Sequence, residues 1–165
     1  MFQKLRSDLF LKFSQIKLVL VNADGFVTDG PESANGSFIN GNHIEELREY
    51  DVELIAFSET KSQTVSSVAE KLGIVLHQGI SEKSLFYTKI KEEYSVSDNE
   101  IALICRDDAD LPLVRKVIFS AVTPEAPLPV KAQAYFATYS AGSGAVGEIA
   151  ALIVKAKKYP GGWSE

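Results

Sequence analysis

The sequence predicts an α/β fold in which helices cover both faces of a mostly parallel central sheet. Short apolar runs such as IKLVLVN at 16–22 and EIALIC at 100–105 alternate along the chain with segments of helical periodicity. Strands without polar alternation are buried on both faces, and strands separated by helices pair in parallel. The 165 residues are the length of one domain, so we expect a single domain over 1–165.

The first element is a predicted amphipathic helix over residues 1–15. Phe2, Leu5, Leu9, Phe13 and Ile16 recur at spacings of three or four residues and form one apolar stripe. Charged side chains interrupt the segment, which is therefore neither a signal peptide nor a membrane span. We expect the stripe to dock against the body of the protein or against a sister subunit rather than against a membrane.

The remaining elements follow in alternation. Runs of Val, Ile, Leu and aromatic residues predict strands at 16–22, 52–58, 74–77, 100–105, 118–122 and 134–138. Helical periodicity predicts helices at 43–50, 61–72, 81–94, 109–116 and 144–158. Ser81, with Lys83 and Ser84, marks the start of the helix at 81–94. The Pro-Gly-Gly segment predicts a flexible tail over 159–165.

The composition excludes several classes of function. A net charge of −5 without runs of Lys or Arg argues against nucleic-acid binding. The single cysteine, Cys105, cannot form an internal disulfide, which is typical of a reducing compartment. We therefore expect a cytoplasmic protein that binds neither nucleic acid nor membrane.

Polar residues close or directly follow several of the predicted strands. In a parallel sheet, the carboxyl ends of the strands form the edge at which ligands bind. The residues that we expect to meet there are Asn22, Asp24, Ser58, Lys83, Arg106 and Asp107.

These motifs, in this order, resemble the haloacid dehalogenase (HAD) superfamily. The segments are NADGFVTDG, FSET, HQGISEK, CRDDADLP and AGSGAVGEI, and the resemblance covers about residues 14–158. Within the superfamily, the capless 3-deoxy-D-manno-octulosonate 8-phosphate phosphatases are closest, and the phosphatase-like domain of sialic-acid cytidylyltransferases is similar. The resemblance implies a three-layer, Rossmann-like fold without a cap domain.

The first motif departs from the family pattern at its catalytic position. The family reaction uses an Asp nucleophile, a second Asp as general acid and base, and Mg²⁺ to neutralise the phosphate. Asp24 matches the general acid/base, whereas Asn22 stands at the nucleophile position. An uncharged amide oxygen is a poor nucleophile toward phosphorus. An Asn at a strand end also commonly bonds neighbouring backbone.

The second and third motifs supply the phosphate-binding groups that the resemblance implies. Ser58 keeps the hydroxyl of the family's Thr-Gly-Arg, but Glu59 follows it and the arginine is missing. We expect Glu59 to repel a phosphate. Lys83 matches the lysine that steadies the phosphate, with a solvated lysine near a helix start as the alternative.

The fourth motif places Arg106 at the metal-ligand position, when the alignment is counted back from Leu111 and Pro112. A guanidinium is always protonated and cannot bind Mg²⁺. A shift of the alignment by one residue would instead make Asp107 the ligand. We expect Arg106 to point toward Asp24 and to occupy the space of the metal.

Two further regions differ from the family. The segment between Gly30 and His43 is shorter than the interval that holds the tetramer-forming hairpin in the family. The glycines of 141–148 are kept, but Ser143 and Gly147 stand where the family has arginine. The missing groups are those that handle a phosphorylated acidic sugar.

The favoured hypothesis is a phosphatase homologue that has lost its activity. It would act without a cofactor, as a binding or oligomerisation module linked to acidic-sugar biosynthesis, with a homotetramer implied by the resemblance. A phosphorylated or acidic sugar is the expected small-molecule partner. The alternatives are an active Mg²⁺-dependent sugar-phosphate phosphatase that uses Asp24, Lys83 and Asp107, and a scaffold without a small-molecule ligand.

Overall fold

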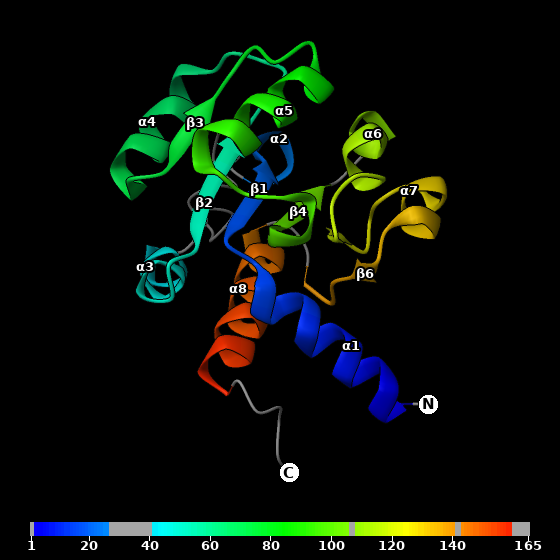
Figure 1. Ribbon diagram of the computed structural model, residues 1–165. Coiled ribbons are helices and arrows are strands. Elements are labelled where there is room, and N and C mark those ends of the chain that lie inside the picture. The colour runs from blue at the N-terminus through cyan, green and yellow to red at the C-terminus, as the bar shows by residue number, and fades with distance from the viewer. Residues whose placement is uncertain (1, 27–40, 106–107, 141–142, 160–165) are drawn as a thin grey trace.

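A computed structural model of the chain describes residues 2–26, 41–105, 108–140 and 143–159 (Figure 1). The helices are α1 Phe2–Gln15, α2 Ala23–Phe26, α3 Gly41–Glu49, α4 Gln63–Leu72, α5 Lys83–Tyr94, α6 Leu111–Val114, α7 Leu128–Gln133 and α8 Ser143–Lys158, with short 3-10 helices η2 Asp98–Glu100 and η3 Asp108–Asp110. The strands are β1 Leu18–Asn22, β2 Glu53–Phe57, β3 Val75–His77, β4 Ile101–Cys105, β5 Phe119–Val122 and β6 Phe136–Ala137.

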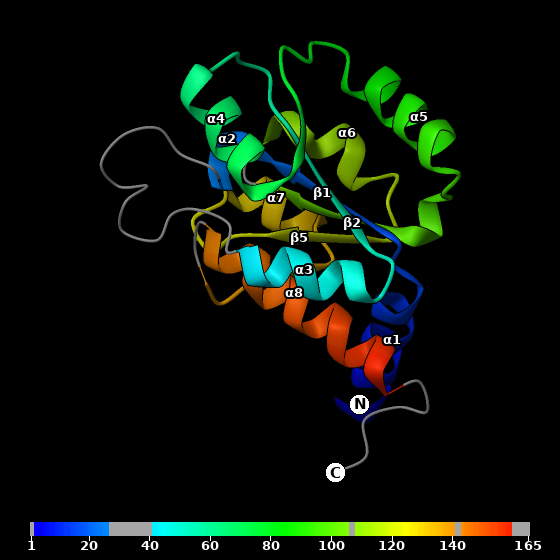
Figure 2. The same cartoon turned by 90° about the vertical axis from the view of Figure 1, so that its left-hand side faces the viewer.

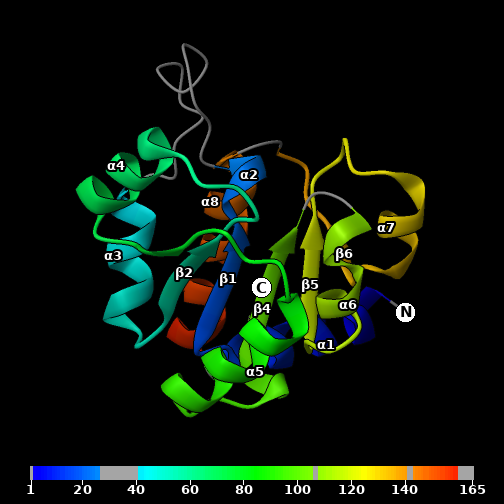
Figure 3. The same ribbon diagram turned by 90° about the horizontal axis from the view of Figure 1, so that it is seen from above.

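The strands form one sheet in the order β3-β2-β1-β4-β5-β6, and every pairing is parallel. The order runs outward from β1 in both directions, so the chain reverses its winding next to β1. Figure 3 shows the strands side by side, with α5 and α6 on the near face and α8 behind them. The predicted α/β fold with helices on both faces of a mostly parallel sheet is confirmed.

The central strands are buried on both faces because their side chains alternate between two apolar clusters. Val19 and Val21 belong to the cluster that packs against α1, α3, α4 and α8. Leu18 and Leu20 belong to the cluster that packs against α5, α6 and α7. All five residues of β1 are buried, which explains why the sequence of this strand shows no polar alternation.

Helix α1 docks against the body of its own chain. Phe13 and Ile16 are fully buried, and the ring of Phe13 lies 4.6 Å from that of Phe119 in β5. Burying an aromatic or aliphatic side chain of this size contributes about 1.5–3 kcal/mol. The predicted apolar stripe of this helix could have docked on the protein itself, on a sister subunit or on a membrane. The burial of its described side chains favours docking on the protein itself. Every helix in the described residues is too short or too polar to span a bilayer.

Two α-helices were absent from the predicted elements, the single turn α2 and the longer α7. α7 begins beside Pro127 and carries Pro129 in its first turn. Proline is tolerated there because the first backbone N–H groups of a helix have no partner within the helix. Val130 of α7 is fully buried in the second cluster, so packing holds a helix in a segment whose prolines suggest a loop.

Helices α3 and α8 lie side by side beneath the sheet (Figure 2), and their contact leaves no room for a side chain at Gly147. A Cβ atom added at Gly147 would lie 2.7 Å from Nε2 of His43. Gly147 is the position at which the family pattern has arginine. In this chain, the imidazole of His43 in α3 crowds the position where the Cβ atom of such a side chain would stand.

Replacing Gly147 by alanine is expected to have opposite effects in two backgrounds. In the native chain the new methyl group overpacks against His43 and destabilises the fold by about 1 kcal/mol. In a His43→Ala background the same change stabilises the helix by about 0.5–1 kcal/mol, because alanine is the better helix former. Urea unfolding of the four chains measures the coupling. If Gly147→Ala changed the stability equally in both backgrounds, residue 147 would not be in close contact with His43.

Candidate active site

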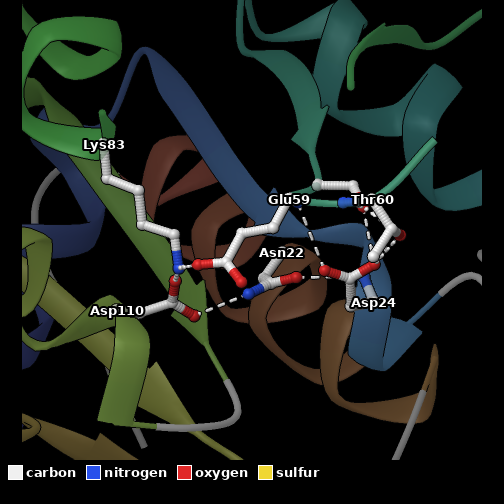
Figure 4. A network of polar contacts seen from close by, with 7 residues as sticks. Asn22, Asp24, Glu59, Thr60, Lys83 and Asp110 are labelled. Carbon is white, nitrogen blue, oxygen red and sulfur yellow. Dashed lines mark hydrogen bonds and ion pairs between the residues drawn. The ribbon is translucent and has the colours of Figure 1, made fainter. Parts of the chain in front are cut away.

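The polar residues that end β1 and β2 meet at the carboxyl edge of the sheet, as expected. Asn22 is the last residue of β1 and pairs in register with Phe57 of β2. Asp24 lies in α2, just after β1, and Ser58 directly follows β2. The side chains of Asn22, Asp24 and Ser58 therefore lie at the same edge of the sheet. Lys83 enters the same site from the first turn of α5 (Figure 4). Arg106 and Asp107 lie outside the described residues, so the expected approach of Arg106 to Asp24 stays a hypothesis.

Asn22 links two acidic residues through its amide group. Its Nδ2 donates to Oδ2 of Asp110 over 2.8 Å. Its Oδ1 accepts from the backbone N–H of Asp24 over 2.9 Å. Only 3% of Asn22 is exposed, and a buried side-chain amide is stable when both its donor and its acceptor are used. The expected bond of Asn22 to nearby backbone is therefore present, and its assignment to the nucleophile position stays a prediction.

Lys83 is a buried cation held by two carboxylates. Its Nζ lies 2.7 Å from Oδ1 of Asp110 and 3.0 Å from Oε1 of Glu59. Its side chain is 7% exposed, so the alternative of a solvated lysine is wrong. Burial by itself lowers the pKa of Lys83, but the hydrogen bonds and charges of Asp110 and Glu59 outweigh burial, and the net pKa is raised.

Asp24 accepts hydrogen bonds from the segment after β2. The Ser58 hydroxyl donates to Oδ1 of Asp24 over 2.6 Å, and the Thr60 hydroxyl donates to the same atom over 3.1 Å. The backbone N–H of Glu59 points to Oδ2 over 3.4 Å. Ser58, predicted to bind phosphate, thus directs its hydroxyl to a carboxylate of the protein itself.

Asp110 is the site residue that the sequence reasoning left without a role. It is fully buried, and its carboxylate accepts from both Asn22 and Lys83. The sequence did contain evidence for a role in the site, because Asp110 directly precedes the Leu111-Pro112 pair from which the fourth motif was aligned. An acidic residue at the start of a helix is normally solvated, so only the fold shows that this one is enclosed.

Glu59 and Thr60 are two further residues of this polar network (Figure 4). The expectation that Glu59 repels a phosphate omitted its partner, since its carboxylate forms an ion pair with Lys83. Glu59 and Lys83 are separated by a helix and a strand in the sequence. The parallel pairing of β2 with β3 brings them together.

The described part of the site does not fit a magnesium ion. Mg²⁺ requires near-octahedral coordination by oxygen atoms. Asn22 turns its nitrogen toward Asp110, and both oxygens of Asp110 already accept hydrogen bonds from Asn22 and Lys83. Within the described ranges, no cluster of three or more His, Cys, Asp or Glu side chains has metal-binding geometry.

Several proteins that resemble this chain in sequence and fold are 3-deoxy-D-manno-octulosonate 8-phosphate phosphatases. The chain is 26% identical to the 3-deoxy-D-manno-octulosonate 8-phosphate phosphatase of Escherichia coli, across 92% of this chain and 86% of that one. The cobalt-bound phosphatase from Haemophilus influenzae is 27% identical, with a TM-score of 0.78, and the match covers 89% of this chain and 92% of the other. No family model matches the sequence.

A further solved structure has the same fold. The 3-deoxy-D-manno-octulosonate 8-phosphate phosphatase from Moraxella catarrhalis, solved with a magnesium ion, a phosphate ion and a KDO molecule, is 24% identical. It superimposes with a TM-score of 0.80 over 93% of this chain and 94% of that one. The homologues and structural neighbours of this chain are thus the HAD-superfamily phosphatases that its motifs resemble.

Proposed function

We propose that this relative of the 3-deoxy-D-manno-octulosonate 8-phosphate phosphatases has lost their hydrolytic activity. It would serve as a binding or oligomerisation module linked to the biosynthesis of acidic sugars. The observation that carries the proposal is Asn22 at the nucleophile position, with its amide nitrogen 2.8 Å from Asp110. An amide in that place offers no charged oxygen to attack phosphorus.

The charges of the site support the same proposal. An active site of this kind holds clustered carboxylates that a metal ion neutralises. Here Lys83 contacts Asp110, and Asn22 replaces one carboxylate by an amide. The described groups therefore use one another as ion-pair and hydrogen-bond partners, and we propose that the protein acts without a metal cofactor.

An active phosphatase is the second candidate, because two groups of the family's machinery are kept. Asp24 stands at the general acid/base position, and Lys83 reaches the same edge of the sheet. In that case Mg²⁺ would be required, with Asp24 and Asp107 as the metal-binding residues. The nucleophile would have to be Asp24 or a water molecule.

The expected assembly and location follow from the resemblance and the composition. We propose a cytoplasmic homo-oligomer, with a tetramer as the starting hypothesis. Light scattering coupled to size-exclusion chromatography tests the assembly directly. A monomer at all concentrations would remove oligomerisation from the proposed role.

The decisive assay measures phosphate release with Mg²⁺ from 3-deoxy-D-manno-octulosonate 8-phosphate and from an aryl phosphate. The native chain is expected to release no phosphate. An Asn22→Asp, Arg106→Asp variant, checked by circular dichroism for folding, is expected to gain turnover because it restores the family's carboxylates. An Asp24→Asn derivative of this variant is the control and should be silent again. Native turnover that disappears with Asp24→Asn alone would establish the active alternative.

A further inference from the structure

The anion-binding groups of the site are directed at carboxylates of the protein itself. One such group is the ammonium of Lys83, which lies 3.0 Å from the Glu59 carboxylate. A second group is the set of donors after β2, where the Ser58 and Thr60 hydroxyls bond Asp24. An ammonium and converging hydroxyl and N–H donors are the features that recognise a phosphate.

We propose that Glu59 is an internal anion that occupies the oxyanion position beside Lys83 and thereby excludes phosphate. The inference rests on the proposed function, because it takes the site to descend from one that bound a sugar phosphate. It goes further in two ways. It names Glu59 as the residue that blocks the site, and it names a small phosphate-like oxyanion as the class of ligand that would bind if the Glu59 carboxylate were removed.

The two carboxylates on Lys83 have different roles because they differ in burial. The side chain of Asp110 is 0% exposed, whereas that of Glu59 is 52% exposed. Asp110 is the permanent counterion of Lys83, held in addition by Asn22. Glu59 lies at the solvent side, where an incoming anion would approach, so it is the carboxylate that such an anion would displace.

The balance of charge shows why phosphate cannot join the site as it stands. Glu59 and Asp110 each carry −1 and Lys83 carries +1, so this ion-pair cluster has a net charge of −1 before a phosphate arrives. A phosphate would enter next to Glu59 and compete with it for one ammonium. Like charges placed in direct contact repel each other strongly.

The experiment measures binding of inorganic phosphate by isothermal titration calorimetry in metal-free buffer. The native chain is compared with Glu59→Gln, which keeps the size of the side chain and removes its charge. The matched control is Glu82→Gln, which removes the same charge from an exposed residue next to Lys83 in the sequence. Glu59→Gln is expected to bind phosphate at least about tenfold more tightly than the native chain and the control.

Each other outcome overturns the inference. Equal affinity in the native chain and Glu59→Gln would mean that Glu59 does not exclude phosphate. Equal gains in both variants would mean that only the overall charge matters. No binding by any of the chains would mean that the position beside Lys83 is not an oxyanion site.

Turnover assays keep this inference separate from the proposed loss of activity. The calorimetry uses neither Mg²⁺ nor a phosphate ester, so it reports binding alone. Hydrolysis by the native chain would refute the loss of activity while leaving the binding result to decide the role of Glu59. Failure of Glu59→Gln to bind phosphate, with a silent native chain, would refute only the present inference.

Discussion

Asp110→Ala is expected to destabilise the protein by about 3 kcal/mol, the largest effect among the site residues. The change leaves the Lys83 ammonium without its buried counterion and the Asn22 amide without an acceptor. Both groups stay enclosed, because Asn22 is 3% exposed and the Lys83 side chain 7% exposed. Urea unfolding at neutral pH, followed by circular dichroism, gives the difference in free energy.

Glu59→Gln is the matched control because it removes the other carboxylate from the same ammonium. The Glu59 side chain is half exposed, and exposed ion pairs contribute only about 0–1 kcal/mol. We therefore expect a loss of less than about 1 kcal/mol. Similar losses for Asp110→Ala and Glu59→Gln would show that Asp110 is not the buried anchor of this network.

Asn22→Asp is expected to destabilise the fold by about 2–3 kcal/mol at neutral pH, although it restores the family's residue. The new carboxylate would stand where the amide nitrogen now lies 2.8 Å from Asp110. Two carboxylates at this distance cannot both ionise freely, so one of them has a raised pKa and the unpaired charge or its protonation costs folding free energy. Urea unfolding in metal-free buffer measures the loss.

The matched rescue adds Asp110→Asn to Asn22→Asp and exchanges the two groups. The amide at 110 can then donate to the carboxylate at 22, and its oxygen can accept from Lys83. We expect the double variant to recover about half or more of the stability lost by Asn22→Asp, which a double-mutant cycle quantifies. A double variant as unstable as the sum of the single changes would contradict direct pairing of residues 22 and 110.

Both predictions describe a site in which a cation of the chain pairs with two of its own carboxylates. Lys83 is the cation, and Asn22 replaces a carboxylate that would otherwise face Asp110. The same replacement that removes the nucleophile also removes the repulsion that a metal ion relieves in a phosphatase. If the proposed function is correct, Asn22 alone accounts both for the loss of hydrolytic activity and for a site that needs no metal ion.

The fold was largely predictable from local pattern. The strand predicted at 16–22 is β1 at Leu18–Asn22, and the helix predicted at 81–94 is α5 at Lys83–Tyr94. Such elements are set by short-range periodicity, which a sequence displays directly. The strand predicted at 134–138 is the shorter β6 at Phe136–Ala137, an edge strand that pairs with β5. The predicted tail from 160 onward lies outside the described residues.

The sequence by itself predicted four residues of the site, because Asn22, Asp24 and Ser58 lie at or just after the ends of predicted strands and Lys83 lies at the start of a predicted helix. Only the tertiary structure decided their partners. Asp110 and Glu59 are far from Lys83 along the chain, and no local pattern specifies contacts over such separations. Burial then decided their roles, since the same ammonium is held by one enclosed carboxylate and one exposed carboxylate. Solvent screening weakens only the exposed contact.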